Sequence, residues 1–474
     1  MTKPYQFGSL VLLVVAAMVG TGVFTTSGFT LMAVETPGRV MVCWAMAGII
    51  AVCGAVAYGR LAGLIPESGG EYLYLSRHVH PLAGFLAGWT SLTAGFSGAT
   101  AAAAVAFEQY AVPEQLAEYV PADSVAVAVI MVCSLLHCFH VRLGAWIQNA
   151  VVVIQLLAVT AFVFAAAVSF NTHQWHWISD SAEPLSWSSL IPRMAESIVW
   201  ISLSYAGFNA AIYVAGESEA AERSVPKALL IGTVAVTLLY LVLNLIFVTA
   251  APRDELAGQP AVAAIAAAAI GGRQLETLIR VAVSLGLLTS VMSMVMTGPR
   301  VYSQMANDGI FPPAFRTANA EYEGRGFRRS ILLQSLIAIG LIGLQRVLVQ
   351  ISIITDSLLG LLIYVSTTLS LSSALCVATL FLPSVRRTPV TSRSMTADLA
   401  AAVFVLSSLL AILLMVWQHK VGGQPQGIWH LLGIAVTLAS GLGAWWYFGR
   451  PSSPRTSHEE DQPTAESSSS SLSG

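Results

Sequence analysis

Charged residues are scarce in this sequence. Asp, Glu, Lys and Arg make up 10% of its 474 residues, whereas a soluble globular domain carries about 25%. The formal net charge is −2, and the sequence has no basic patch of useful size. Binding to nucleic acid depends on clustered Lys and Arg, so no nucleic-acid partner is expected. The shortage of charge also excludes an ordinary soluble domain.

Cysteine and groups of metal ligands are also sparse. The five cysteines are odd in number and lie in apolar stretches, which favours free thiols that pack as small hydrophobic side chains: Cys43, Cys53, Cys133, Cys138 and Cys376. His137 and His140 share a helix face at i, i+3 spacing, but no third ligand is evident. We therefore expect no metal site and no cofactor, and prefer a structural role for both histidines.

Long apolar stretches dominate the sequence, which is 55% hydrophobic with a mean hydropathy of +0.71. A transmembrane helix needs about 20 consecutive apolar residues. The first stretch is too long for a signal peptide and lacks a cleavage site, so it is expected to be the first span. Twelve spans are predicted: 8–33, 40–64, 82–107, 124–140, 145–169, 194–216, 228–250, 275–305, 330–348, 351–382, 399–416 and 428–448. The longer stretches at 275–305 and 351–382 predict tilted or projecting helices.

Orientation follows from the distribution of Lys and Arg, which are enriched in cytoplasmic loops. With the N-terminus inside, 16 of the 23 Lys and Arg residues lie on the cytoplasmic side and seven lie outside. Both termini are then cytoplasmic, and the plasma membrane, or the inner membrane of a Gram-negative bacterium, is the expected location. Residues 1–450 form one transporter-like domain, and the polar tail at 451–474 is expected to be disordered.

Two of the apolar stretches are broken in the middle. Gly20-Thr21-Gly22 interrupts 8–33, and Ser204-Tyr205-Ala206-Gly207 interrupts 194–216. Glycine weakens a helix by about 1 kcal/mol relative to alanine, and an unwound turn in lipid is tolerated only where it lines a cavity. Such breaks in corresponding positions of two halves indicate the central site of a transporter. The placement predicts inverted repeats of five spans at about 8–169 and 194–382, with 399–448 as an addition.

The two breaks offer complementary backbone charges. The first exposes N–H groups at the start of a half-helix, where partial positive charge favours a carboxylate. The second leaves carbonyl oxygens at the end of a half-helix, which suit an ammonium group. Neither break contains a charged side chain, so together they would hold both ends of a zwitterion. The alternative is that the glycines only allow close helix packing.

Four motifs carry a resemblance to a known family. Gly20-Thr-Gly-Val-Phe24 resembles the Gly-Ser-Gly-Ile-Phe signature of the amino acid–polyamine–organocation superfamily of permeases. Pro66-Glu-Ser-Gly-Gly-Glu-Tyr72 and the segment 298–309 resemble two further motifs of that superfamily, and Tyr205–Asn209, with Glu217 and Pro226, is similar to its L-type branch. The resemblance implies an all-α leucine-transporter fold with broken helices 1 and 6, amino-acid substrates, and exchange or proton-coupled uptake by alternating access.

Carried over by position, the resemblance also implies substrate contacts in both breaks: Thr21, Gly22 and Val23 in the first, and Leu203, Ser204, Ala206, Gly207 and Asn209 in the second. Leu203 stands where many relatives have a bulky aromatic gate. Asn209 stands where a cationic exchanger has Glu, so neutral amino acids are expected. Gln155 occupies the coupling-site position at which relatives often carry Lys. Since Gln155 cannot titrate, proton coupling by that route is not expected, and facilitated or exchange transport is favoured.

Four charged residues and one loop bear on the same predictions. Arg60 stands where the superfamily commonly has Glu, and Arg280, Asp356 and Glu196 are candidates for either structural ion pairs or gating. The loop 108–123 contains no cysteine, which argues against a disulfide-linked accessory subunit; the oligomeric state stays undetermined. The predicted function is transport of neutral L-amino acids through the bilayer, coupled to protons or to a counter-substrate. The alternatives are a cationic amino-acid or polyamine exchanger, an intramembrane enzyme at His137 and His140, or a sensor that binds without translocating.

Overall fold

The structure of the chain is a computed structural model. It describes residues 6–65, 67, 69–112, 116, 118–139, 141–177, 185–218, 220–317, 324–354, 356–386, 395–421 and 426–448. His140 and the tail at 451–474 lie outside these residues, as does Pro66 of the motif at 66–72.

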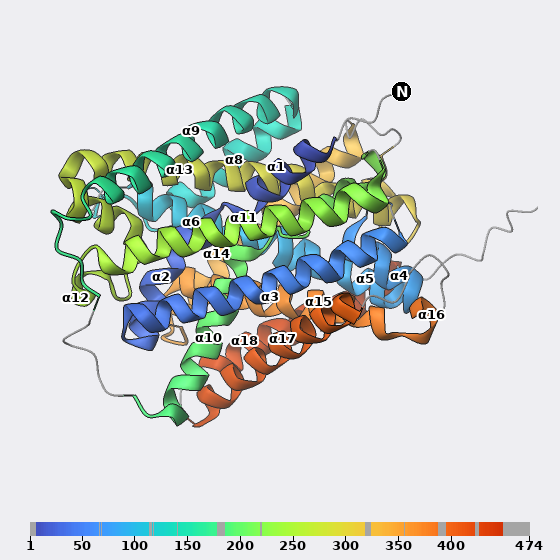
Figure 1. Cartoon of the computed structure of the whole chain (residues 1–474). Coiled ribbons are helices and arrows are strands. Elements are labelled where there is room, and N and C mark those ends of the chain that lie inside the picture. Colours follow the sequence, from blue (N-terminus) through green and yellow to red (C-terminus); the bar gives the residue numbers. More distant parts are fainter. Residues whose placement is uncertain are drawn as a thin grey trace, which may run out of the picture.

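The described residues form a bundle of long helices (Figure 1). The helix α4 lies at one end of the bundle and α12 lies at the other (Figure 1). The α-helices are α1 (Phe7–Met18), α2 (Thr21–Val34), α3 (Pro37–Leu64), α4 (Gly70–His78), α5 (Pro81–Thr90), α6 (Ala99–Ala111), α8 (Ser124–Phe139), α9 (Val141–Val168), α10 (Trp187–Tyr205), α11 (Ala221–Thr249), α12 (Arg253–Leu256), α13 (Val262–Asn307), α14 (Arg325–Gln350), α15 (Ser357–Ala378), α16 (Pro383–Arg386), α17 (Met395–Val421) and α18 (Gln426–Phe448). The remaining elements are a π-helix, η1 (Ser91–Gly98), and three 3₁₀ helices, η2 (Ala210–Glu217), η3 (Pro313–Phe315) and η4 (Thr379–Phe381).

A helix occupies each of the twelve predicted spans. Among the described residues, nine helical segments are long and apolar enough to cross a membrane, or ten if the bent pair of α1 and α2 is one span. The helix α8 and the apolar part of α9 at 153–168 are shorter. The chain is therefore an all-helical, multi-pass membrane protein.

Two predicted spans differ from the structure in their starting points. The long span at 275–305 belongs to α13, whose helical geometry fails at Gly271 and at Gly272, where φ is +63°. The part of α13 before this kink lies ahead of the predicted span and was not expected, whereas 275–305 itself forms one helical piece after it. The span predicted to begin at residue 351 begins at Ser357, because the Asp356 side chain accepts a hydrogen bond from the Leu359 N–H at 2.7 Å and caps α15.

The helix α11 lies between α1 and α3 and contacts both (Figure 1). Its buried Tyr240 packs edge-on against Trp44 of α3, with ring centroids 5.6 Å apart, and against Tyr205 of α10 at 5.3 Å. This aromatic cluster joins three helices and places the end of α10 beside the end of α1. The five cysteines are free thiols, four of them buried and Cys53 partly buried, which confirms the prediction made for them.

Candidate functional site

The first predicted break is present. The helix α1 ends at Met18, α2 begins at Thr21, and the two are bent by 42°. Gly20 precedes α2 with φ −137° and ψ −149°, outside the helical region. The N–H groups in the first turn of a helix have no partner within it, and the helix dipole adds partial positive charge there. The N–H groups of Thr21, Gly22 and Val23 therefore lie where a helix begins.

The second predicted break is also present. The helix α10 ends at Tyr205, and a turn at 206–209 leads into η2. Gly207 has φ +101°, and a Cβ there would lie 2.6 Å from the carbonyl oxygen of Ala17. Three carbonyls of the break accept bonds from N–H groups three residues further on, those of Leu203, Tyr205 and Gly207. A carbonyl oxygen has two lone pairs, so each retains one acceptor position.

The two breaks lie in direct contact. A Cβ on Gly22 would come 2.2 Å from Ser204 Oγ, so α2 and α10 touch at this point. The Tyr240 hydroxyl donates to the carbonyl of Met18 at 2.6 Å and lies 3.0 Å from that of Ser204. It therefore bonds to carbonyls on both breaks. Gly22 does allow close helix packing, which is the alternative explanation for the glycines. It does so next to the interruption between α1 and α2.

A cavity of about 290 Å³ lies at the breaks. Five of the predicted contact residues lie on its wall: Gly22, Leu203, Ala206, Gly207 and Asn209. Val23 and Ser204 are buried and are not on this wall, and the side chain of Thr21 lies outside the description. Ser204 Oγ is buried and has no hydrogen-bond partner among the described residues.

The cavity wall also includes residues of the third and eighth predicted spans, 82–107 and 275–305, which the sequence predicts to help form the site without indicating which residues do so. The π-helix η1 contributes Ser91 and Phe96, and π-helical turns are frequent at functional sites; no pattern in the sequence marks this one. Glu71 of α4 and Arg300 of α13 are the two charged residues on the described wall. Glu71 belongs to the motif at 66–72, which is a signal that could have identified it.

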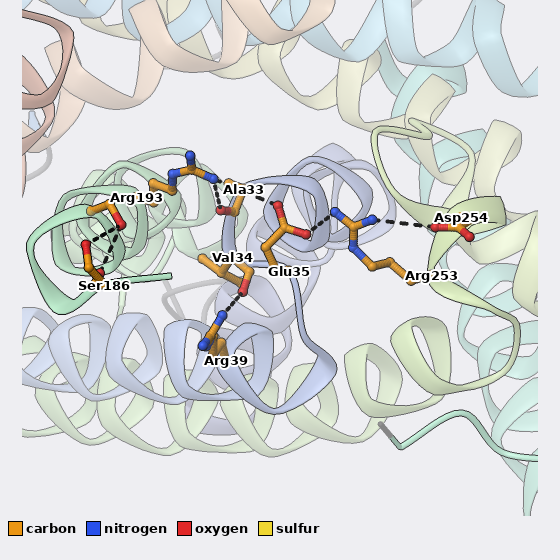
Figure 2. A network of polar contacts seen from close by, with 9 residues as sticks. Ala33, Val34, Glu35, Arg39, Ser186, Arg193, Arg253 and Asp254 are labelled. Carbon is orange, nitrogen blue, oxygen red and sulfur yellow. Dashed lines mark hydrogen bonds and ion pairs between the residues drawn. The ribbon is translucent and has the colours of Figure 1, made fainter. Parts of the chain in front are cut away.

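A cluster of charged side chains lies at the C-terminal end of α2 (Figure 2). Glu35, which ends α2 with φ +72°, lies between Arg253 of α12, which donates to its carboxylate, and Arg193 of α10, 3.9 Å away. Nearby, the Gly258 N–H donates to the Gly28 carbonyl at 2.8 Å. The half-helix α2 is thus tied to α10 and to the segment after α12.

The remaining predicted positions lie away from the cavity. Gln155 of α9 is 2% exposed and packs against Gly286 of α13, where a Cβ would meet its Nε2 at 2.2 Å. Arg60 of α3 pairs with Asp398 of α17. Arg280 pairs with Glu276 on its own helix at 2.7 Å. These contacts give Arg60 and Arg280 structural ion pairs, and Asp356 acts as the helix cap described above.

Metal binding has no support among the described residues, which contain no group of three or more His, Cys, Asp or Glu side chains suited to a metal ion. His137 Nδ1 lies 2.8 Å from the carbonyl oxygen of Cys133, one turn earlier in α8. This is the local hydrogen bond expected of a structural histidine.

Comparison with known proteins gives three findings. The sequence profile described as "Amino acid permease" matches residues 5–440. The chain is 28% identical to the b(0,+)-type amino acid transporter 1 of Mus musculus, over 53% of this chain and 52% of that protein. It is 26% identical to the large neutral amino acids transporter small subunit 2 of Homo sapiens, over 63% of this chain and 57% of that protein. The matches therefore span little more than half the length of these relatives.

Among solved structures, the chain is similar to a manganese transporter of Eremococcus coleocola. The TM-score is 0.55 at 14% sequence identity, covering 94% of this chain and 96% of that one. At this identity the likeness concerns the fold.

Proposed function

The chain belongs to the Amino acid permease family, and from this premise we propose that it moves neutral L-amino acids across the membrane by alternating access. The observation that carries the proposal is the contact between the two helix breaks at the wall of one cavity. The family is one of permeases, so an intramembrane enzyme is no longer a competing function.

The substrate is held by its α-carboxylate and α-ammonium groups. The N–H groups of Thr21, Gly22 and Val23 face the carboxylate at the start of α2. The ammonium group is held by backbone carbonyls of the second break, from Leu203, Ser204, Ala206 and Gly207, with the Asn209 side chain beside them. The substrate side chain occupies the rest of the cavity. Because all these groups are uncharged, a dipolar substrate is favoured over an ion.

The finer architecture belongs to the same proposal. Twelve spans form two inverted sets of five, in the leucine-transporter fold, and the last two are additions. Helices α8 and α9 stand where the fourth and fifth spans are expected, and the breaks fall in the first and sixth. Residues 1–450 form this domain, with both termini cytoplasmic and the protein in the plasma membrane. Translocation follows from rocking of one bundle around the fixed site.

Proton coupling through the position of Gln155 is not expected, because its amide cannot carry a proton; this residue alone favours exchange or facilitated transport. A cationic amino-acid or polyamine exchanger is the second candidate, and the presence of Glu71 on the cavity wall is the observation in its favour. The names of the relatives include both a large neutral amino acids transporter and a b(0,+)-type transporter. Experiment must decide between the two substrate classes.

The test is thermal stabilisation of the purified protein by each of the twenty L-amino acids, followed by counterflow of the stabilising ones in proteoliposomes. A ligand at about 100 times its Kd stabilises the folded state by about 2.7 kcal/mol. Neutral L-amino acids are expected to stabilise the protein and to exchange. Stabilisation by cationic amino acids alone would indicate the cationic exchanger, and stabilisation without counterflow would indicate a sensor.

Gly207→Ala and Gly309→Ala form a matched pair for this test. Both glycines have positive φ, +101° and +79°, so an added Cβ strains both backbones. Only at Gly207 does the Cβ meet another segment, since nothing lies within 4 Å of the position at Gly309. Gly207→Ala should abolish ligand stabilisation and counterflow, while Gly309→Ala retains both. Equal activity of the two variants would refute the role of the second break.

A further inference from the structure

Glu71 is a deeply buried carboxylate at the edge of the cavity. It is 4% exposed and belongs to the first turn of α4. The preceding residue, Gly70, lies against the ring of Tyr213 in η2, where a Cβ would come 2.2 Å from the ring. Tyr213 also lies on the cavity wall and interacts with the Asn209 side chain. Tyr213 therefore connects the start of α4, where Glu71 lies, to the second helix break.

Three hydroxyl groups surround this carboxylate. Tyr58 of α3 donates to Oε1, Ser373 of α15 donates to Oε1 at 2.8 Å, and Ser372 donates to Oε2 at 3.0 Å. A hydroxyl group can donate one hydrogen bond and can also accept. The same cage can therefore satisfy a carboxylate, to which it donates, or a carboxylic acid, from which one hydroxyl accepts.

The cage contrasts with the surroundings of other acids in the bundle. Glu35 lies between two arginines, Asp398 pairs with Arg60, and Glu276 pairs with Arg280. Among the described residues, Glu71 takes part in no ion pair and is held by neutral groups alone. A buried ionisable residue on the wall of a cavity is a functional candidate, and a buried carboxylate without a cation is the kind that gains by binding one.

Apart from Glu71, the ionisable groups around this site are phenols, one thiol and one guanidinium. The titratable neighbours are Tyr58 of α3, Tyr213 of η2 and Cys376 of α15, with Tyr74 further along α4. Tyrosine and cysteine ordinarily titrate near 10 and 8.5. The basic residue on the same cavity wall is Arg300 of α13.

We propose that Glu71 is a proton-binding site that couples amino-acid transport to protons. This inference rests on the proposed transport function and adds a coupling ion to it. One proton adds to a carboxylate oxygen; an O–H bond forms, no other covalent bond changes, and the acid then donates to a surrounding hydroxyl. Glu71 becomes neutral, and its hydrogen bonds to α3 and α15 are rearranged beside the second break.

A bound cationic side chain is the competing occupant, and two observations disfavour it. Both carboxylate oxygens already accept hydroxyl donors, which leaves little room for a guanidinium or ammonium group. Arg300 on the same wall would also repel such a group. A proton adds charge without adding volume.

The experiment uses the full chain in proteoliposomes with a tritiated mixture of the twenty L-amino acids, with membrane potential clamped by potassium and valinomycin. Counterflow is measured at symmetrical pH, and accumulation is measured under a gradient of one pH unit. One-to-one coupling allows accumulation of up to about tenfold under that gradient, since one unit corresponds to about 1.36 kcal/mol. Wild type is expected to accumulate substrate, whereas Glu71→Gln exchanges substrate but loses accumulation.

Glu67→Gln is the matched control, because Glu67 lies in the same motif but is 52% exposed and pairs with Arg77. It should behave as wild type. Counterflow without accumulation in wild type, or equal accumulation in Glu71→Gln, would overturn the coupling proposal while leaving transport intact. Absence of counterflow in wild type would instead refute the transport function itself.

Two further readouts complete the test. If Glu71→Gln does not fold, Ser373→Ala replaces it. Losing a donor to the carboxylate favours the protonated form, so the pH of half-maximal accumulation should rise, and an unchanged profile contradicts the proposal.

If Glu71→Gln abolishes competition by L-lysine and L-arginine but keeps accumulation, the site binds cationic side chains and the proposal is wrong.

Discussion

Gly22 of α2 and Ser204 of α10 are in direct contact, although 182 positions separate them in the sequence. A Cβ on Gly22 would lie 2.2 Å from Ser204 Oγ and 2.6 Å from Ser204 Cα. Contacts this short cannot be relieved by rotating the serine side chain, because one of them is to the backbone. The separation of the two breaks is therefore fixed by the absence of a side chain at position 22.

Gly22→Ala should push the two breaks apart. Overpacking of this kind costs about 1–3 kcal/mol, so a lower melting temperature is expected, together with loss of counterflow. Gly8→Ala is the control, because nothing lies within 4 Å of its Cβ position. Adding Ser204→Gly removes the side-chain part of the clash and should restore part of the stability. Unchanged counterflow in Gly22→Ala would contradict the geometry of the site.

Tyr240→Phe should loosen both breaks at once. The ring keeps its packing against Trp44 and Tyr205, but the carbonyls of Met18 and Ser204 lose the hydroxyl shared between them. Leaving buried acceptors unsatisfied costs about 1–3 kcal/mol. The expected result is reduced thermal stability and a weaker stabilising effect of amino acids, measured by thermal shift with and without ligand.

Tyr364→Phe is the control for this substitution. Tyr364 is also buried, and its hydroxyl bonds to Thr437 of α18 at 2.7 Å, away from the cavity wall. It should lose stability without losing the response to ligand. A full ligand response in Tyr240→Phe would show that the two carbonyls need no such donor.

The helices and their breaks could be predicted because each leaves a local pattern. Hydrophobic length marks a span, and Gly20 and Gly22 mark an interruption within one. Tyr240 leaves no such pattern, since it is a single tyrosine in an uninterrupted apolar helix. Its hydroxyl can reach the carbonyls of both breaks only because α11 packs beside them, and this arrangement depends on the tertiary structure.

Glu71 shows a second limit of sequence reasoning. The prediction of neutral substrates depends on the absence of acids within the two breaks. Glu71 lies outside them, more than 130 positions before the second break. Its motif at 66–72 indicates only a resemblance to the superfamily, whereas α4 places the carboxylate on the cavity wall. The kink at Gly271 and Gly272 was missed for a related reason, because the glycine pair precedes the predicted span at 275–305.

The pair between Arg60 and Asp398 gives a stability prediction. Arg60 of α3 is 11% exposed at its side chain, and Asp398 lies at the start of α17. Removing one partner of a fully buried pair costs about 3–5 kcal/mol, whereas an exposed pair is worth about 0–1 kcal/mol. The Asp398 side chain is 31% exposed, so Asp398→Leu should lower the melting temperature by an amount between these two limits.

The double variant Arg60→Met with Asp398→Leu should recover most of this loss, since neither charge remains. Thermal unfolding of wild type, both single variants and the double variant gives the coupling energy. A double variant no more stable than Asp398→Leu alone would argue that the pair orients α17 rather than merely neutralising Arg60.

The cluster around Glu35 predicts a change in access to the cavity. Glu35→Gln removes the carboxylate charge that Arg253 and Arg193 share, so the end of α2 should separate more readily from α10 and α12. Access is measured in a variant that lacks the native cysteines and carries Ser202→Cys on the cavity wall. The measured quantity is the rate at which this cysteine reacts with a membrane-impermeant thiol reagent added on the face that carries Glu35. Weakening these contacts by about 1.4 kcal/mol would make their separation about ten times more frequent and would raise the reaction rate accordingly. Glu67→Gln breaks an exposed pair worth about 0–1 kcal/mol and should leave the rate unchanged. An unchanged rate in Glu35→Gln would mean that the ion pairs do not control access from this face.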